Sequence, residues 1–183
     1  VTLASSLDRA RFRPHLLVPR AGQLSQRWES LGWPVHILPW RAATVYFIPA
    51  LWARLAASRQ MEALIREQGI AAVHAEYHSL PFALPAAERA GVPLLWTCMG
   101  WWFQPHLWQR GFFQRPAAAF AHSQAIKNGF LGSPPFMPPE RIDVLYPGVD
   151  TARFHPGVDG IKVRFEAGIA QDAPVVAMIA RFQ

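Results

Sequence analysis

The sequence of 183 residues is short of cysteine and lysine and has no long apolar run. Its one cysteine, Cys98, excludes an internal disulfide and a multi-cysteine metal site, and it fits a reducing compartment. No stretch reaches the roughly 18 apolar residues of a membrane-spanning helix. The chain begins at Val1 without a methionine or a basic segment followed by an apolar core, so we expect an internal start rather than a signal peptide.

The sequence also has few charged residues, since they make up 16% of the chain while hydrophobic residues make up 51%. This composition favours a folded globular protein. The formal net charge is +6, and sixteen of the eighteen basic residues are arginines spread along the whole chain. Nucleic-acid surfaces usually cluster Lys and Arg, so we expect no nucleic-acid partner. A nucleotide diphosphate and an anionic membrane remain open as partners.

Short apolar runs alternate with longer segments of helical periodicity. Continuous apolar runs are typical of strands buried on both faces, and they occur at residues 15–19, 35–38, 71–75, 93–98, 117–122, 143–146 and 175–180. Helices are predicted at residues 23–31, 46–68, 80–90 and 123–131, and a short one near 162–167. Gly32, Gly69 and Gly91 follow three of these helices, where a left-handed cap is expected. The alternation predicts βαβ units and an α/β fold with a parallel sheet flanked by helices.

The most informative segment spans residues 141–156 and contains Tyr146-Pro147-Gly148-Val149-Asp150 and then Phe154-His155-Pro156. By itself it reads as a strand, a turn at Gly148 and a buried anchor at Phe154. Its surroundings add Ser123 before it, an Arg-x3-Gly-Ile segment at 164–169, and an apolar run that ends in Arg181.

This ordered set resembles the retaining glycosyltransferases of family 4, which have the GT-B fold and show the patterns "ki.vi.nGvD...F.p" and "gR...KG". Residues 19–38 and Val73-His74-Ala75-Glu76 resemble further family segments. The resemblance implies a Rossmann-like, acceptor-side N-terminal domain over residues 1–170 whose first strand and glycine-rich loop would precede Val1. It also implies that residues 171–183 begin the C-terminal domain that binds a nucleotide-sugar.

The resemblance implies sugar transfer from a nucleotide-sugar to a carbohydrate or lipid-linked acceptor, with retained configuration and with neither cofactor nor metal. In the family, an arginine at the position of Arg181 contacts the donor diphosphate, for which guanidinium is a suitable bidentate partner. The other half of the enzyme would supply more donor contacts, so the chain alone is expected to be inactive. Met99 stands where many relatives have a histidine in the cleft, and no catalytic residue is therefore assigned.

Several polar residues are candidates for lining the cleft, because ligands bind at the carboxyl ends of parallel strands. They are His74, Glu76, Thr97, Gly100, Ser123 and Gly148. His74, Glu76 and His78 also suggest a metal site, but the spacing suits a helix and the segment is predicted as a strand end. Cys98 is interpreted as a buried, inert thiol.

An aromatic segment, Trp101-Trp102-Phe103, is followed by further tryptophan, phenylalanine and arginine residues. It predicts either packing over the acceptor cleft or contact with a membrane interface. The expected location is cytoplasmic, with peripheral contact to the inner membrane face left open. A binding module for carbohydrates or membranes, without catalysis, is the alternative function.

Overall fold

The computed structural model describes residues 2–40, 51–76, 78–98, 107–131, 135 and 137–178. The chain forms two compact units, Val1–Tyr146 and Pro147–Gln183. The domain boundary expected between residues 170 and 171 falls inside the second unit and stays a prediction.

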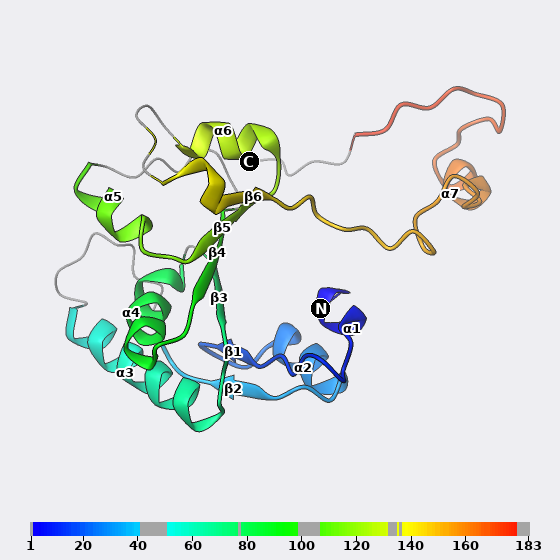
Figure 1. Cartoon of the computed structure of the whole chain (residues 1–183). Helices are drawn as coiled ribbons and strands as arrows, with labels where there is room; N and C mark the ends of the chain where they lie inside the picture. The colour runs from blue at the N-terminus through cyan, green and yellow to red at the C-terminus, as the bar shows by residue number, and fades with distance from the viewer. Residues whose placement is uncertain are drawn as a thin grey trace. The chain divides into compact units, whose positions relative to one another are not determined.

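The first unit follows the predicted alternation of strands and helices (Figure 1). Its strands are β1 Leu16–Val18, β2 Val35–Ile37, β3 Val73–Glu76, β4 Leu94–Cys98, β5 Ala118–Ala121 and β6 Ile142–Val144. Its helices are α1 Thr2–Ser6, α2 Gln23–Ser30, α3 Leu51–Glu67, α4 Leu80–Ala90, α5 Leu107–Phe113 and α6 Gln124–Leu131, with a 3-10 turn, η2, at Pro139–Arg141. The six strands expected in this unit are confirmed, while β3 starts two residues later and β6 one residue earlier than predicted.

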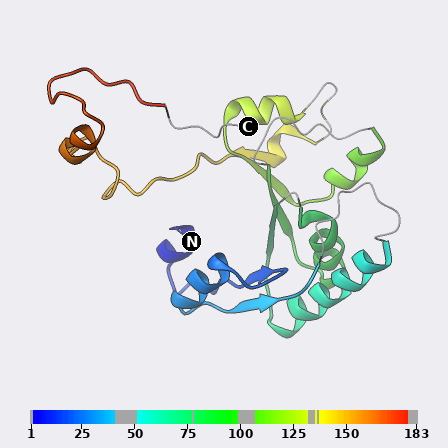
Figure 2. The same ribbon diagram turned by 180° about the vertical axis from the view of Figure 1, so that it is seen from behind.

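Every strand pair in the described residues is parallel, as predicted. The strands form a two-stranded sheet, β1-β2, and a four-stranded sheet in the order β3-β4-β5-β6. Helices α3, α4 and α5 lie on one side of the four-stranded sheet in both ribbon views (Figures 1 and 2). This placement follows from right-handed crossovers, because each new strand is added at the same edge of the sheet.

The core lies between these helices and the sheet. Ala75, Trp96, Ala119 and Ile142 are register partners across β3–β6, and each is at most 3% exposed. The next residue on each strand points to the other face of the sheet. On that face Thr97 and Phe120 are half-buried, whereas Glu76 and Asp143 are exposed. The expectation of strands buried on both faces is therefore wrong at this end of the sheet.

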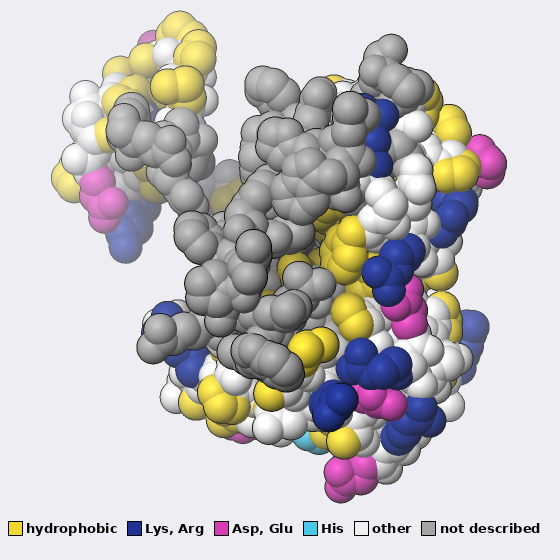
Figure 3. Space-filling model, turned by 90° about the vertical axis from the view of Figure 1, so that its left-hand side faces the viewer, with side chains coloured by type: hydrophobic (Ala, Val, Ile, Leu, Met, Phe, Trp, Pro, Cys, Tyr) yellow, Lys and Arg dark blue, Asp and Glu magenta, His cyan; other side chains and the backbone are white. Residues whose placement is uncertain are grey.

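Glycines end three of the helices, and ion pairs join two of them. Gly32, Gly69 and Gly91 have φ values of 77°, 61° and 74°, which confirms the predicted left-handed caps. Glu62 accepts hydrogen bonds from Arg66 at 3.2 Å and from Arg89 at 2.6 Å, joining α3 to α4. Figure 3, which views the side of these helices, shows basic side chains beside acidic ones. That face is mixed in charge rather than uniformly basic.

The second unit contains one helix in its described part, α7 Ile161–Glu166, close to the short helix predicted there. Asp150 accepts hydrogen bonds from the backbone N–H groups of Ala152 and Arg153, which fixes a turn. Two expectations are wrong. Phe154 is 58% exposed and is no buried anchor, and residues 175–178 form no strand, because an apolar run becomes a strand only where a neighbouring strand pairs with it.

Candidate functional site

The candidate site lies at the carboxyl ends of β3, β4 and β5. Because these strands are parallel, their carboxyl ends share one edge of the sheet, where ligands bind in folds of this kind. Glu76 is the last residue of β3, and its register partner on β4 is Thr97. Thr97 in turn is the register partner of Phe120 on β5. The structure thus brings predicted site residues from separate segments of the chain onto one face.

His74 and Thr97 form the best-defined contact of this group. The Nε2 atom of His74 lies 2.5 Å from the Thr97 hydroxyl, within hydrogen-bonding distance. The His74 ring meets Phe120 edge-on, with 6.5 Å between ring centroids. The residue as a whole is exposed, but its ring packs on the sheet. Burial of the ring lowers the pKa of His74 below 6.5, an effect that the nearby Glu76 carboxylate partly offsets. A neutral imidazole paired with a hydroxyl can orient a polar substrate group.

Glu76 is held through its backbone and leaves its carboxylate exposed. Its N–H donates to the Ser79 hydroxyl at 3.1 Å, and that hydroxyl donates to the Glu76 carbonyl at 3.0 Å. This turn leads directly into α4 and fixes the end of β3. The Glu76 carboxylate is an acceptor suited to sugar hydroxyls or other donors.

Ser123 and Gly148 occupy different surroundings. The Ser123 hydroxyl accepts a hydrogen bond at 3.1 Å from the backbone N–H of Ile126, so it caps the start of α6. Gly148 belongs to the second unit, and its φ lies outside the left-handed region. A Cβ at this position would meet no atom within 4 Å. The expected turn at Gly148 is therefore not formed within this unit, and its role in lining the cleft stays a prediction.

Other predicted residues lie outside the described part of the chain. These are Gly100, Arg181, Met99 and the aromatic residues Trp101, Trp102 and Phe103, while of Cys98 only the backbone is described. Their expected roles stay predictions.

The sequence places His122 at the end of the apolar run 117–122, as a strand-end polar group, but His122 is not among the residues selected for the cleft. The residue directly follows β5, and its Nε2 atom is buried without a hydrogen-bond partner in the described part of the chain. The sequence shows only that His122 ends an apolar run, because whether one ring nitrogen is paired depends on the three-dimensional surroundings.

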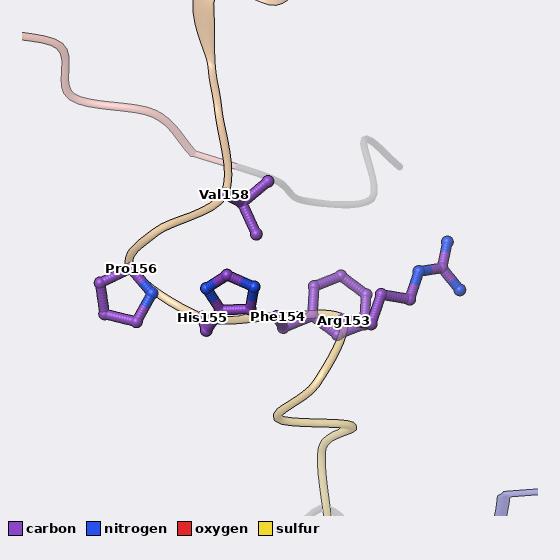
Figure 4. Close-up of a pocket in the computed structure, with 5 residues that line it drawn as sticks. All are labelled: Arg153, Phe154, His155, Pro156 and Val158. Carbon is purple, nitrogen blue, oxygen red and sulfur yellow. The ribbon is translucent and has the colours of Figure 1, made fainter.

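The second unit has a shallow hollow lined by Arg153, Phe154, His155, Pro156 and Val158 (Figure 4). All five residues come from one loop, and the Arg153 guanidinium carbon stacks 5.1 Å from the Phe154 ring centre. A binding site normally gathers polar groups from several elements, so this hollow is a weaker candidate than the edge of the sheet. Within the described residues, no cluster of three or more His, Cys, Asp or Glu side chains could hold a metal ion.

Comparisons with known proteins agree with this architecture. The sequence model of Glycosyltransferase Family 4 matches residues 1–153, whereas no match was found among curated proteins. A glycosyltransferase from Rickettsia africae ESF-5 has a TM-score of 0.74 at 14% identity, over 94% of this chain and 45% of its own. Alr3699/HepE from Anabaena, in complex with UDP-glucose, has a TM-score of 0.64 at 19% identity, over 91% and 45%. MurG from Acinetobacter baumannii has a TM-score of 0.56 at 14% identity, over 81% and 41%.

The chain therefore spans less than half the length of these solved structures. At such identities the likeness shows the fold, an α/β Rossmann-like half of a GT-B architecture. The family match is independent of that likeness and extends over more than half of the chain. The parallel sheet, the helices on its face and the family match lead to one conclusion: the chain belongs to Glycosyltransferase Family 4.

Proposed function

We propose that this chain is the acceptor-side half of an enzyme that transfers a sugar from a nucleotide-sugar to a carbohydrate or lipid-linked acceptor, with retained configuration. The observation that carries the proposal is the polar group at the edge of the sheet, His74, Thr97 and Glu76, in a chain of this family. An exposed carboxylate beside a hydroxyl–imidazole pair suits a ligand rich in hydroxyl groups. The related HepE structure contains UDP-glucose, which supports a nucleotide-sugar donor.

Donor chemistry is assigned to the start of the second domain. Sugar transfer leaves negative charge on the departing diphosphate, and an arginine stabilises that charge through two parallel N–H···O bonds. We assign this role to Arg181, at the end of the apolar run from Val175, on the resemblance to the family. Residues 171–183 then begin the donor domain, and the 183-residue chain alone should catalyse no transfer.

The test uses the protein that contains this chain together with its other half, incubated with a panel of nucleotide-sugars and carbohydrate acceptors. Arg181→Ala should lower kcat/KM at least about tenfold, because one charged hydrogen bond in the transition state contributes more than about 1.4 kcal/mol. Arg59→Ala is the matched control, since Arg59 is an exposed arginine of α3. Equal rates for the two variants would remove the diphosphate role. Tight binding of donor or acceptor without turnover would favour a non-catalytic binding module.

Membrane contact is a separate part of the proposal. No helix in the described part of the chain is long and apolar enough to cross a membrane. We assign a peripheral contact with the cytoplasmic membrane face to the segment Trp101-Trp102-Phe103, because tryptophan and phenylalanine beside arginine suit the lipid interface. Such a contact would bring the acceptor side of the enzyme to a lipid-linked substrate.

A further inference from the structure

Two histidines are paired on the two-stranded sheet, outside the candidate site. His36 is the middle residue of β2, and its register partner on β1 is Leu17. His15 directly precedes β1. Because alternate residues of a strand point to the same face, His15, Leu17 and His36 share one face of this sheet. The Nδ1 atom of His15 lies 2.9 Å from the Nε2 atom of His36, so a hydrogen bond joins the two half-buried rings.

The ring geometry shows that this hydrogen bond is nearly linear. The two ring planes differ by only 3°, and the ring centres lie 5.2 Å apart. The distance between the centres exceeds the 2.9 Å between the nitrogens by about two ring radii, which is the largest excess that the rings allow. The parallel rings therefore lie edge to edge in nearly one plane rather than face to face. One N–H group fills the space between the two nitrogens, and either ring can be its donor.

This arrangement treats a first and a second added proton differently. The first can bind the outer nitrogen of the donor ring, and the bridge then remains as a charge-assisted hydrogen bond. The second has to bind the nitrogen that accepts the bridge. It therefore breaks the hydrogen bond and leaves two cations in contact, which repel each other. The bridged pair resists full protonation, and full protonation destroys the bridge.

The surroundings of the pair also oppose positive charge. Burial lowers the pKa of His15 below 6.5, and the charges of His36 and Arg13 lower it further. The contribution of His15 to stability is therefore complete above pH 6.5 and is lost as the pH falls through its folded pKa. Helix α2 packs on both strands, and Leu17 and Leu38 pack against the core to which α3 contributes. The described charged residues of these two helices are Arg27, Glu29, Arg59, Glu62, Arg66 and Glu67. None of them is among the causes that shift the pKa of His15, so no carboxylate compensates an added charge there.

We propose that the His15–His36 pair is a pH-sensitive latch that joins the start of β1 to β2 while one proton bridges the two rings, and that opens when both rings are protonated. The backbone bond nearest to the pair runs from the Leu16 N–H to the Pro34 carbonyl at 3.0 Å. Opening of the latch loosens this end of the sheet first. Because Leu17 packs against the core of the first unit, the loosening reaches that core. This inference does not depend on the proposed function.

The first measurement is an NMR titration of the two imidazole rings in the wild-type protein that contains this chain. Interacting groups release their protons in two steps that belong to the pair. Both rings should therefore report the same two steps, separated by at least about one pH unit. A single independent step for each ring would overturn the latch. This measurement needs no variant, so a variant that fails to fold cannot leave the proposal undecided.

The second measurement is amide hydrogen exchange, corrected for the intrinsic effect of pH. The Ala117 N–H is the reference, because it donates to the Leu94 carbonyl at 2.8 Å at the corresponding place between β4 and β5. The protection of Leu16 relative to Ala117 should fall at least about tenfold between about pH 7.5 and about pH 5, since a coupling of one pK unit corresponds to a factor of ten. The ratio cancels any loss of global stability. An unchanged ratio would contradict the latch.

Glutamine variants show whether the two rings act as a pair. His15→Gln and His36→Gln each keep a hydrogen-bonding side chain but remove one titrating ring, so each alone should abolish most of the pH dependence of the Leu16 ratio. The double variant should then remove no more than either single variant. His155→Gln is the matched control, because His155 is exposed in the second unit, and it should leave the dependence unchanged. If each single variant removed half of the effect and the double variant removed all of it, the histidines would titrate independently and the latch would be refuted.

Discussion

Trp96 gives the most decisive prediction about what holds the candidate site in place. It is completely buried on β4, directly before Thr97, and its ring centre lies 5.1 Å from that of Phe113 on α5. Its register partners on both neighbouring strands, Ala75 and Ala119, are alanines that are at most 3% exposed. Small residues on either side leave room for the indole and cannot fill the space if it is removed.

Trp96→Ala should therefore lower the free energy of unfolding by about 3–5 kcal/mol, the range for large aromatic truncations in packed cores. The buried area gives a similar free energy, because an indole buries roughly 150–250 Å² and each Å² contributes about 25 cal/mol. Trp96→Phe keeps an aromatic ring against Phe113 and should cost only about 1–2 kcal/mol.

The assay is urea unfolding of the 183-residue chain followed by far-ultraviolet circular dichroism, which is independent of tryptophan fluorescence. Leu24→Ala is the control, because Leu24 is 48% exposed on α2 and its truncation should change stability by no more than about 0.5 kcal/mol. A loss below about 1 kcal/mol for Trp96→Ala would refute the packing described for β4 and α5.

Two further predictions concern pH and membranes. Burial lowers the pKa of His74 below 6.5, so between its folded pKa and 6.5 the unfolded chain binds more protons than the folded one. The contribution of His74 to stability should be complete above pH 6.5 and be lost as the pH falls through the folded pKa. His74→Gln should flatten this part of the curve of stability against pH. An unchanged curve would contradict the burial of the ring. For the membrane contact, the chain should sediment with vesicles containing anionic lipid, and changing Trp101 and Trp102 to Ala should abolish this binding. Equal sedimentation of the variant would reject that contact.

Local sequence signals were sufficient for most of the first unit. Gly32, Gly69 and Gly91 were predictable as caps because a left-handed backbone strongly favours glycine at the end of a helix. The parallel sheet followed from the alternation of apolar runs with helices. The ends of the strands were less predictable, because β3 begins where Val73 pairs with Leu94 rather than where the apolar run begins. The apolar run at Val175 shows the same limit, since it has no paired strand in the described residues.

The candidate site was predictable in part, for a related reason. Strand-end positions indicated His74, Glu76 and Thr97. The 2.5 Å contact between His74 and Thr97, which are 23 positions apart in the sequence, depends on the register of β3 with β4. Ser123 was selected by its place after β5, and the structure shows it capping a helix. The unpaired nitrogen of His122 becomes visible only when every hydrogen bond around it is known.

Sugar transfer itself is the most direct test of the account. The protein that contains this chain and its other half should be incubated with nucleotide-sugars and a panel of carbohydrate and lipid-linked acceptors, and both released nucleotide and glycosylated product should be measured. We predict that one nucleotide-sugar is consumed in an acceptor-dependent reaction and that the product keeps the anomeric configuration of the donor. A folded protein that forms no glycosylated product with any donor would contradict the account.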